Sequence, residues 1–127
     1  MSGSTWNTAQ LNELAELEEL VLVISKTDRA TLRFPVWPVV VDGNPYVRSY
    51  LGVTTGWYRR VVANPRQAIV LDGQDLEVLF EFVSRTDPVN KGIDSAFLSK
   101  YARFEYRDAM AEPGAVDATL RILPASD

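Results

Sequence analysis

The 127-residue chain has a globular composition, with 46% hydrophobic and 24% charged residues and a net charge of −4. This length suits a single domain over residues 1–127, and the negative charge disfavours broad binding to nucleic acid or acidic membranes. The chain has no cysteine and no histidine, which excludes disulfides, thiolate metal sites and histidine-based catalysis. We expect no metal cofactor. We also expect a cytoplasmic protein, because no segment resembles a targeting sequence or a membrane span. Residues 1–5 are expected to be disordered.

The first predicted element is a helix from Ala9 to Glu19. Asn7 and Gln10 have the spacing of a capping box, and Trp6 and Leu11 that of a hydrophobic staple. The polar face of this helix carries an acidic run: Glu13, Glu16, Glu18 and Glu19. This run indicates a solvated helix face, with a metal site as the alternative.

Short strands follow the helix. Leu20 to Ser25 is rich in β-branched residues and is followed by a polar turn, Lys26 to Asp28. The next strand is predicted from Thr31 to Val41. Because Pro35 and Pro38 each remove a hydrogen-bond donor, this strand must lie at an edge, a bulge or a bend.

An Asp-Gly turn at Asp42-Gly43 predicts a hairpin whose return strand runs from Tyr46 to Leu51. A loop from Gly52 to Gly56 then leads into a short helix from Trp57 to Ala63. The remaining elements are a hairpin of Gln67–Leu71 and Asp75–Ser84, a helical region after Asp87-Pro88, and a strand from Ala118 to Leu123. Together they predict a mainly β (α+β) fold, a small antiparallel barrel of about six strands with peripheral helices.

The step Thr54-Thr55-Gly56 before the short helix is the clearest candidate binding site. It offers hydroxyls, free backbone N–H groups and the positive end of a helix dipole, while Trp57 and Tyr58 supply flat rings. Arg59 and Arg60 lie in the expected first turn, where the dipole disfavours cations unless an anion is bound. This pattern predicts a site for a phosphate attached to an aromatic ring system. Simple threonine capping of the helix is the alternative.

A third arginine belongs to the strand that precedes this step. The period of two places Tyr46, Arg48 and Tyr50 on one face, which is the outer face if the alternate residues form the core. Arg48 would then be available for anion binding or for cation–π packing. The alternative is an ion pair across strands with Glu77 or Glu81. The sequence leaves both possibilities open.

Four segments together carry a family resemblance: RFPVWPVVVDGNPYVRS, WYRRVVANP, IDSAFLSKYARF and ATLRILP. As an ordered set, from Trp6 to Pro124, they resemble bacterial domain-of-unknown-function family 2255. That family is grouped with split β-barrel flavin-binding proteins and is distantly similar to deazaflavin-dependent nitroreductases. The resemblance implies a six-stranded split β-barrel with a cofactor groove along Arg33 to Trp37 and Tyr46 to Tyr50. In split-barrel relatives this groove often lies at a homodimer interface.

The leading hypothesis is therefore a protein that binds FMN or a deazaflavin nucleotide, as an oxidoreductase acting on a small-molecule substrate. Tyr50 is the candidate catalytic residue, to polarise a carbonyl or donate a proton. The candidate cofactor-binding residues are Arg33, Trp37, Arg48, Ser49, Thr54, Thr55, Gly56, Trp57, Tyr58, Arg59 and Arg60. Among them, the phosphate is assigned to Arg48, Arg59, Arg60 and Thr54 to Gly56, and the ring to Trp37, Trp57 and Tyr58. The alternative is a non-enzymatic split-barrel homodimer or small-ligand-binding protein.

Overall fold

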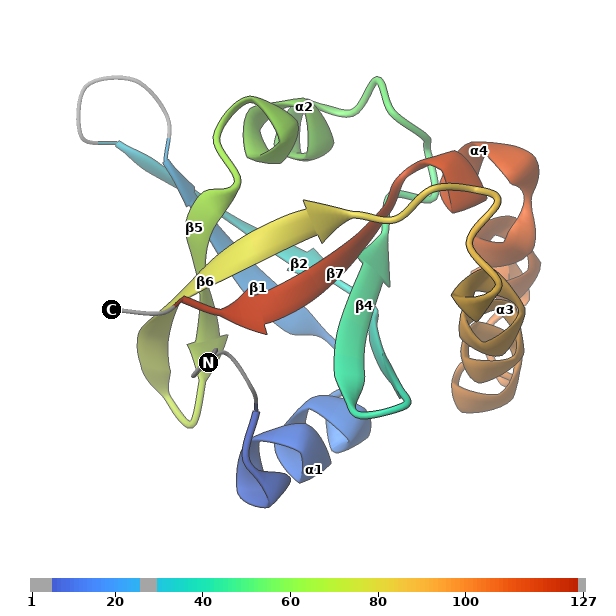
Figure 1. The fold of residues 1–127 in the computed structure, drawn as a ribbon, viewed down its shortest axis with the longest axis horizontal. Helices are drawn as coiled ribbons and strands as arrows, with labels where there is room; N and C mark the ends of the chain where they lie inside the picture. The colour runs from blue at the N-terminus through green and yellow to red at the C-terminus, as the bar shows by residue number, and fades with distance from the viewer. Residues whose placement is uncertain (1–5, 26–29, 126–127) are drawn as a thin grey trace.

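The structure, a computed structural model, describes residues 6–25 and 30–125, with only the backbone of residues 106–107. The expectations for residues 1–5 and for the turn from Lys26 to Asp28 lie outside the described residues. Within the described part, an antiparallel sheet curls into a half-barrel with four α-helices around it (Figure 1). The predicted α+β class and split-barrel architecture are confirmed.

Seven strands form the sheet in the described ranges, one more than predicted. Their order is β2-β1-β5-β6-β7-β4-β3, and every neighbouring pair is antiparallel. The strands are β1 (Leu20–Ser25), β2 (Thr31–Val36), β3 (Pro38–Val41), β4 (Asn44–Arg48), β5 (Arg66–Leu71), β6 (Gln74–Phe82) and β7 (Thr119–Pro124).

The extra strand arises because the segment from Thr31 to Val41 divides at Trp37 into β2 and β3. These two strands form the opposite edges of the sheet, with β2 paired to β1 and β3 paired to β4. Pro35 lies in β2 and Pro38 begins β3, both in edge strands, where a missing donor is tolerated. The predicted edge and bend are confirmed, and the prediction of one continuous strand is wrong.

The helices lie around the rim of the sheet. Figure 1 shows α1 below it, α2 above it, and α3 and α4 together beside β4. Asn7 and Gln10 form the predicted capping box, but α1 ends at Glu16 rather than at Glu19. Within the described residues the helices are α1 (Thr8–Glu16), α2 (Gly56–Ala63), α3 (Val89–Lys100) and α4 (Pro113–Asp117), with a 3-10 helix at Glu105–Ala111.

Two hydrophobic clusters bury both faces of β4. The first fills the barrel and includes Val47, and the second lies against α3 and includes Tyr46 and Phe97. Tyr46, Val47 and Arg48 are each no more than 1% exposed. The expectation of an outer face carrying Tyr46 and Arg48 is therefore wrong. The period of two correctly separated the faces of this strand, but α3 covers the face that was expected to meet water.

Candidate functional site

A cavity of about 640 Å³ opens beside the ends of β2 and β4. The edge strand contributes Phe34 to Trp37, and the segment after β4 contributes Arg48 to Leu51. The beginning of α2 contributes Thr55 to Trp57, while Glu19 and Met110 complete this part of the lining. The cavity therefore lies where the ends of β2 and β4, the bend at Trp37 and the N-terminus of α2 come together.

Aromatic side chains form two walls of the cavity. The indole of Trp37 stacks on the ring of Tyr101, with 4.1 Å between centroids and 3° between planes. The Tyr101 hydroxyl donates a hydrogen bond to the backbone oxygen of Pro38 at 3.0 Å, which holds the stack to the chain. On the α2 side, the rings of Phe34 and Trp57 lie 6.1 Å apart. Contacts within the protein thus hold flat apolar surfaces in place on two sides of the cavity.

The N-terminus of α2 has no side-chain cap. Thr55 is the N-cap residue, but its hydroxyl lies 2.8 Å from the Ser49 hydroxyl and makes no capping hydrogen bond. The alternative that threonine caps this helix is therefore wrong. The first backbone N–H groups of the helix are left for water or a ligand, and Gly56 and Trp57 line the cavity.

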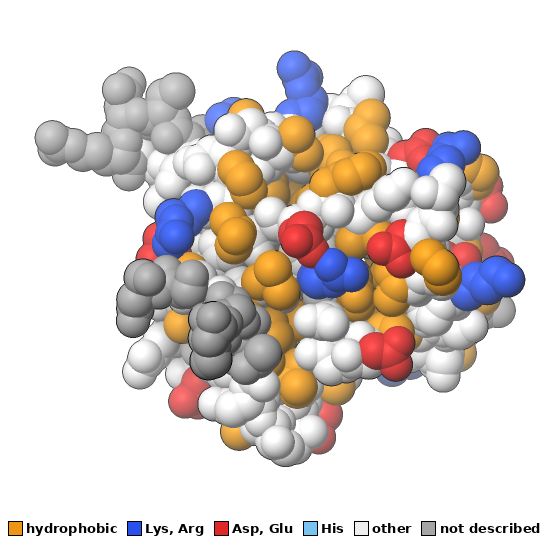
Figure 2. Space-filling model, viewed as in Figure 1, with side chains coloured by type: hydrophobic (Ala, Val, Ile, Leu, Met, Phe, Trp, Pro, Cys, Tyr) orange, Lys and Arg blue, Asp and Glu red, His pale blue; other side chains and the backbone are white. Residues whose placement is uncertain are grey.

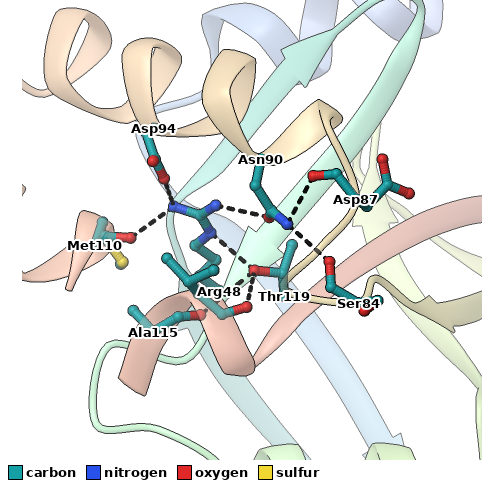
Figure 3. Close-up of polar contacts among 9 residues, drawn as sticks. Arg48, Ser84, Asp87, Asn90, Asp94, Met110, Ala115 and Thr119 are labelled. Atoms are coloured by element: carbon teal, nitrogen blue, oxygen red, sulfur yellow. Dashed lines mark hydrogen bonds and ion pairs between the residues drawn. The ribbon is translucent and has the colours of Figure 1, made fainter. Parts of the chain in front are cut away.

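Arg48 is buried in a polar network that joins β4 to α3, to the 3-10 helix and to β7 (Figure 3). Its side chain is only 1% exposed, and burial lowers its pKa while the Asp94 carboxylate opposes that shift. The guanidinium donates four hydrogen bonds: Nε to Thr119 Oγ1 at 2.8 Å, Nη1 to Asp94 Oδ1 at 2.5 Å and Met110 O at 2.7 Å, and Nη2 to Asn90 Oδ1 at 3.0 Å. Its charge is compensated within the fold.

The carboxylates expected as partners of Arg48 bind other arginines. Glu77 pairs with Arg66 at 2.9 Å, and Glu81 pairs with Arg121. Both pairs lie on β5, β6 and β7, where Figure 2 shows red and blue side chains next to one another among hydrophobic ones. The predicted alternative, an ion pair of Arg48 across strands with Glu77 or Glu81, is therefore wrong, because the carboxylate partner of Arg48 is Asp94 on α3. The cation–π alternative is present, with the guanidinium 5.6 Å from the centroid of Phe97.

The structure brings only part of the candidate set to the cavity. The candidates in its lining are Trp37, Arg48, Ser49, Tyr50, Thr55, Gly56 and Trp57. The candidates outside its lining are Arg33, Thr54, Tyr58, Arg59 and Arg60. Arg33 pairs with Asp75 at 2.9 Å, and Tyr58 is buried, with its pKa raised by burial and by Asp117.

Arg59 and Arg60 are exposed and form no ion pair with any residue of the described ranges. The structure corrects the placement of Arg60 in the first turn, because it belongs to the last turn of α2, where the dipole favours a cation. The unfavourable placement that suggested a bound anion therefore does not hold for Arg60.

Sequence reasoning missed Asn90 and Asp94, the two α3 residues that bind Arg48. A signal was present: they are spaced i, i+4 beside Ile93 and Phe97, so a polar pair borders an apolar helix face. It also missed Met110 and Glu19 in the cavity lining, for which only the folded arrangement gives a signal, whereas Phe34 lies within the predicted groove segment from Arg33 to Trp37.

None of the described helices is long and apolar enough to cross a membrane. Across residues 6–25 and 30–125, no group of three or more acidic residues is placed to hold a metal ion.

Solved structures of low sequence identity share this fold. The haem storage protein HutZ from Vibrio cholerae gives a TM-score of 0.71 at 13% identity, over 94% of this chain and 91% of its own. A FAD-binding protein from Mesorhizobium loti gives 0.60 at 20% identity, over 97% and 92%. An F420 reductase gives 0.63 at 13% identity, over 96% and 97%. These likenesses support the split-barrel fold.

No curated protein sequence matches the chain. A family match, in contrast, covers residues 10–122, which is most of the sequence, and it confirms the resemblance seen in the four segments. The chain belongs to the bacterial family described as "Uncharacterized protein conserved in bacteria (DUF2255)".

Proposed function

We propose that the protein binds a flavin or deazaflavin nucleotide, with the ring system in the cavity and the phosphate at the N-terminus of α2. The observation that carries this proposal is a cavity of about 640 Å³ between aromatic walls, ending at an uncapped helix N-terminus. That volume suits a ligand of nucleotide size. The FAD-binding protein and the F420 reductase among the structures of this fold support the proposed cofactor class.

The cavity residues divide into two roles in this proposal. Trp37 and Trp57 flank the ring, while the backbone of Gly56 and the hydroxyls of Ser49 and Thr55 meet the phosphate end. Arg59 and Arg60 add positive potential on the same helix without lining the cavity. Arg33, Thr54 and Tyr58 receive no role in ligand binding, since they lie outside the lining.

A bound flavin or deazaflavin supplies hydride transfer, and the protein supplies orientation and electrostatics. On this basis we propose an oxidoreductase whose small-molecule substrate enters at the open side of the cavity. Tyr50 lines the cavity and is 52% exposed, and we assign its phenol the role of donating a proton to a substrate at the rim.

We also propose that the protein forms a homodimer. Four large apolar side chains at or next to the cavity mouth are more than a third exposed: Phe34, Tyr50, Leu51 and Val53. Apolar side chains gathered in this way are typical of an interaction site. Light scattering during size-exclusion chromatography tests the proposal, and a monomer at micromolar concentration would overturn it.

The cofactor proposal is tested by titrating riboflavin, FMN, a deazaflavin nucleotide and hemin separately, with Gly56→Ala as the decisive variant. A Cβ at Gly56 meets no atom within 4 Å, so the fold accommodates it, yet the methyl group occupies the phosphate end. We expect Gly56→Ala to weaken FMN binding about tenfold and to leave riboflavin unchanged. Gly114→Ala is the matched control, since its Cβ also meets nothing and Gly114 lies outside the lining.

The outcomes separate the alternatives. Failure of every flavin and deazaflavin to bind, or binding of hemin alone, would contradict the proposed cofactor class. Equal affinity for riboflavin and FMN would instead favour a non-enzymatic small-ligand binder that takes the ring without a phosphate. The compensated charge of Arg48 favours this second function, because Asp94 already occupies the guanidinium.

A further inference from the structure

Among the described residues, two charged side chains line the cavity, those of Glu19 and Arg48. Arg48 is paired with Asp94 at 2.5 Å and donates three further hydrogen bonds to groups of the fold. Glu19 is exposed, and its carboxylate has no hydrogen-bond or ion-pair partner among the described residues. Among the described lining residues, the charge that has no partner is therefore the negative charge of Glu19.

Glu19 lies at the Trp37 end of the cavity. It directly precedes Leu20, which pairs across β1 and β2 with Val36, the residue before Trp37. The pKa of Tyr101, whose ring stacks on Trp37, is raised by burial and then by the charges of Glu18 and Glu19. Both observations put the Glu19 carboxylate beside the Trp37 wall.

The α2 end of the cavity has the opposite polarity. There the lining consists of Thr55, Gly56 and Trp57, at the uncapped N-terminus of an eight-residue helix. Backbone N–H groups and the positive end of the helix dipole favour acceptors and anions at this end. One cavity thus has an acceptor at one end and donors at the other.

We propose that Glu19 determines specificity by accepting a hydrogen bond from an N–H group on the edge of the bound ring. This inference rests on the proposed function and names the ring chemistry of that same site. The cavity then selects a flat heteroaromatic ring with an imide or amide N–H at one edge and an anionic tail at the other. Flavins and deazaflavins have this imide, whereas the outer edge of a porphyrin carries carboxylates that the Glu19 charge repels.

The test compares riboflavin with N3-methylriboflavin, in which the imide N–H is replaced by a methyl group. Neither probe carries a phosphate, so the α2 end is not engaged through its anion. The decisive variant is Glu19→Gln, and the matched control is Glu16→Gln, which removes an equally exposed carboxylate that does not line the cavity. Glu19 makes no hydrogen bond or ion pair within the described residues, so we expect its substitution to leave folding unchanged.

We expect methylation of the ring to weaken binding to the unsubstituted protein at least tenfold. Glu19→Gln should weaken riboflavin binding about tenfold, since the hydrogen bond loses its charge, and should not weaken binding of the methylated ring. Glu16→Gln should bind both probes as the unsubstituted protein does. If riboflavin binds equally to all three proteins and methylation has no effect, the role of Glu19 is overturned while the cofactor proposal stands. If riboflavin binds to none of them, both are overturned.

Discussion

Arg48 and the pair Arg59 and Arg60 look alike in the sequence, but they have opposite environments in the fold. Arg48 is 1% exposed and held by four hydrogen bonds, whereas Arg59 and Arg60 are exposed and form no ion pair within the described part of the chain. A buried guanidinium is useful to the fold because its partners are fixed. An exposed one contributes little to the fold but is free to attract an anion. The number of arginines near a candidate site is therefore not the number of positive charges available to a ligand.

The largest effect on the free energy of unfolding is expected from Arg48→Met, which tests whether the buried arginine stabilises the fold. It leaves Asp94 without its cation and the Asn90 side-chain oxygen without its donor. Because Arg48 is buried but the Asp94 side chain is 35% exposed, we expect the free energy of unfolding to fall by about 3 kcal/mol, the lower end of the range for breaking a buried ion pair. Urea denaturation followed by circular dichroism measures this change.

Two further variants make the result interpretable. Arg48→Lys keeps the charge but replaces the planar fork with a point charge, so we expect a smaller loss than for Arg48→Met. Arg33→Met removes an exposed pair with Asp75 and should change the free energy of unfolding by no more than about 1 kcal/mol. If Arg48→Met and Arg33→Met were equally stable, the network around Arg48 would not stabilise the fold as we describe.

Lys100 has an environment intermediate between that of the buried Arg48 and that of the exposed Arg59 and Arg60. Its ammonium is partly buried and donates to the backbone oxygen of Pro38 at 2.6 Å, and it has no carboxylate partner among the described residues. Burial lowers the pKa of Lys100 to about 8. A partly buried cation whose hydrogen bonds go to carbonyl acceptors, Leu14 O and Pro38 O, is thus less well compensated than Arg48.

The free energy of unfolding should consequently rise as the pH passes the lowered pKa of Lys100. A lysine whose pKa is lower in the folded than in the unfolded state destabilises the fold while both states are protonated. This penalty disappears as the folded state loses its proton above about pH 8 while the unfolded state still keeps one. We expect the free energy of unfolding to increase by about 1–2 kcal/mol between about pH 7 and pH 9.5.

Urea titrations at several pH values measure this slope, with Lys100→Met as the control in which it should vanish. Measurements should stay below pH 10, because the raised pKa values of Tyr58 and Tyr101 reverse the trend at higher pH. A flat profile in the unsubstituted protein, or an equal rise in Lys100→Met, would contradict the burial of an uncompensated ammonium.

Local patterns in the sequence were sufficient for much of the fold. The bounds of β1 were predicted correctly, and the capping box of Asn7 and Gln10 is present. These features depend on neighbouring residues only. Pro35 and Pro38 likewise revealed an edge and a bend, but they did not reveal that β2 and β3 lie at opposite edges of the sheet. That arrangement depends on pairings between distant segments.

The candidate site shows the same limit more clearly. The start of the short helix and the ring of Trp57 were found from a short segment, since backbone geometry and residue type act locally there, but the sequence left open whether a threonine side chain caps the helix. The partners of Arg48 are at least 42 residues away in sequence, so its burial was not apparent from strand periodicity. Glu19 lines the cavity although it belongs to a run that was predicted to be a solvated helix face.

The smallest effect on stability is expected from the double substitution Arg59→Gln and Arg60→Gln, which tests whether the exposed arginines are available to an anionic ligand. Because these exposed side chains make no ion pair among the described residues, we expect the free energy of unfolding to change by less than about 0.5 kcal/mol. At low salt the variant should bind FMN several-fold more weakly, since two charges near the α2 end are lost, and should bind riboflavin unchanged. The difference for FMN should shrink at high salt, because exposed charges are screened. A loss that is equal for both ligands, or independent of salt, would mean that these arginines act by shaping the cavity, and the division between structural and available charge would then fail.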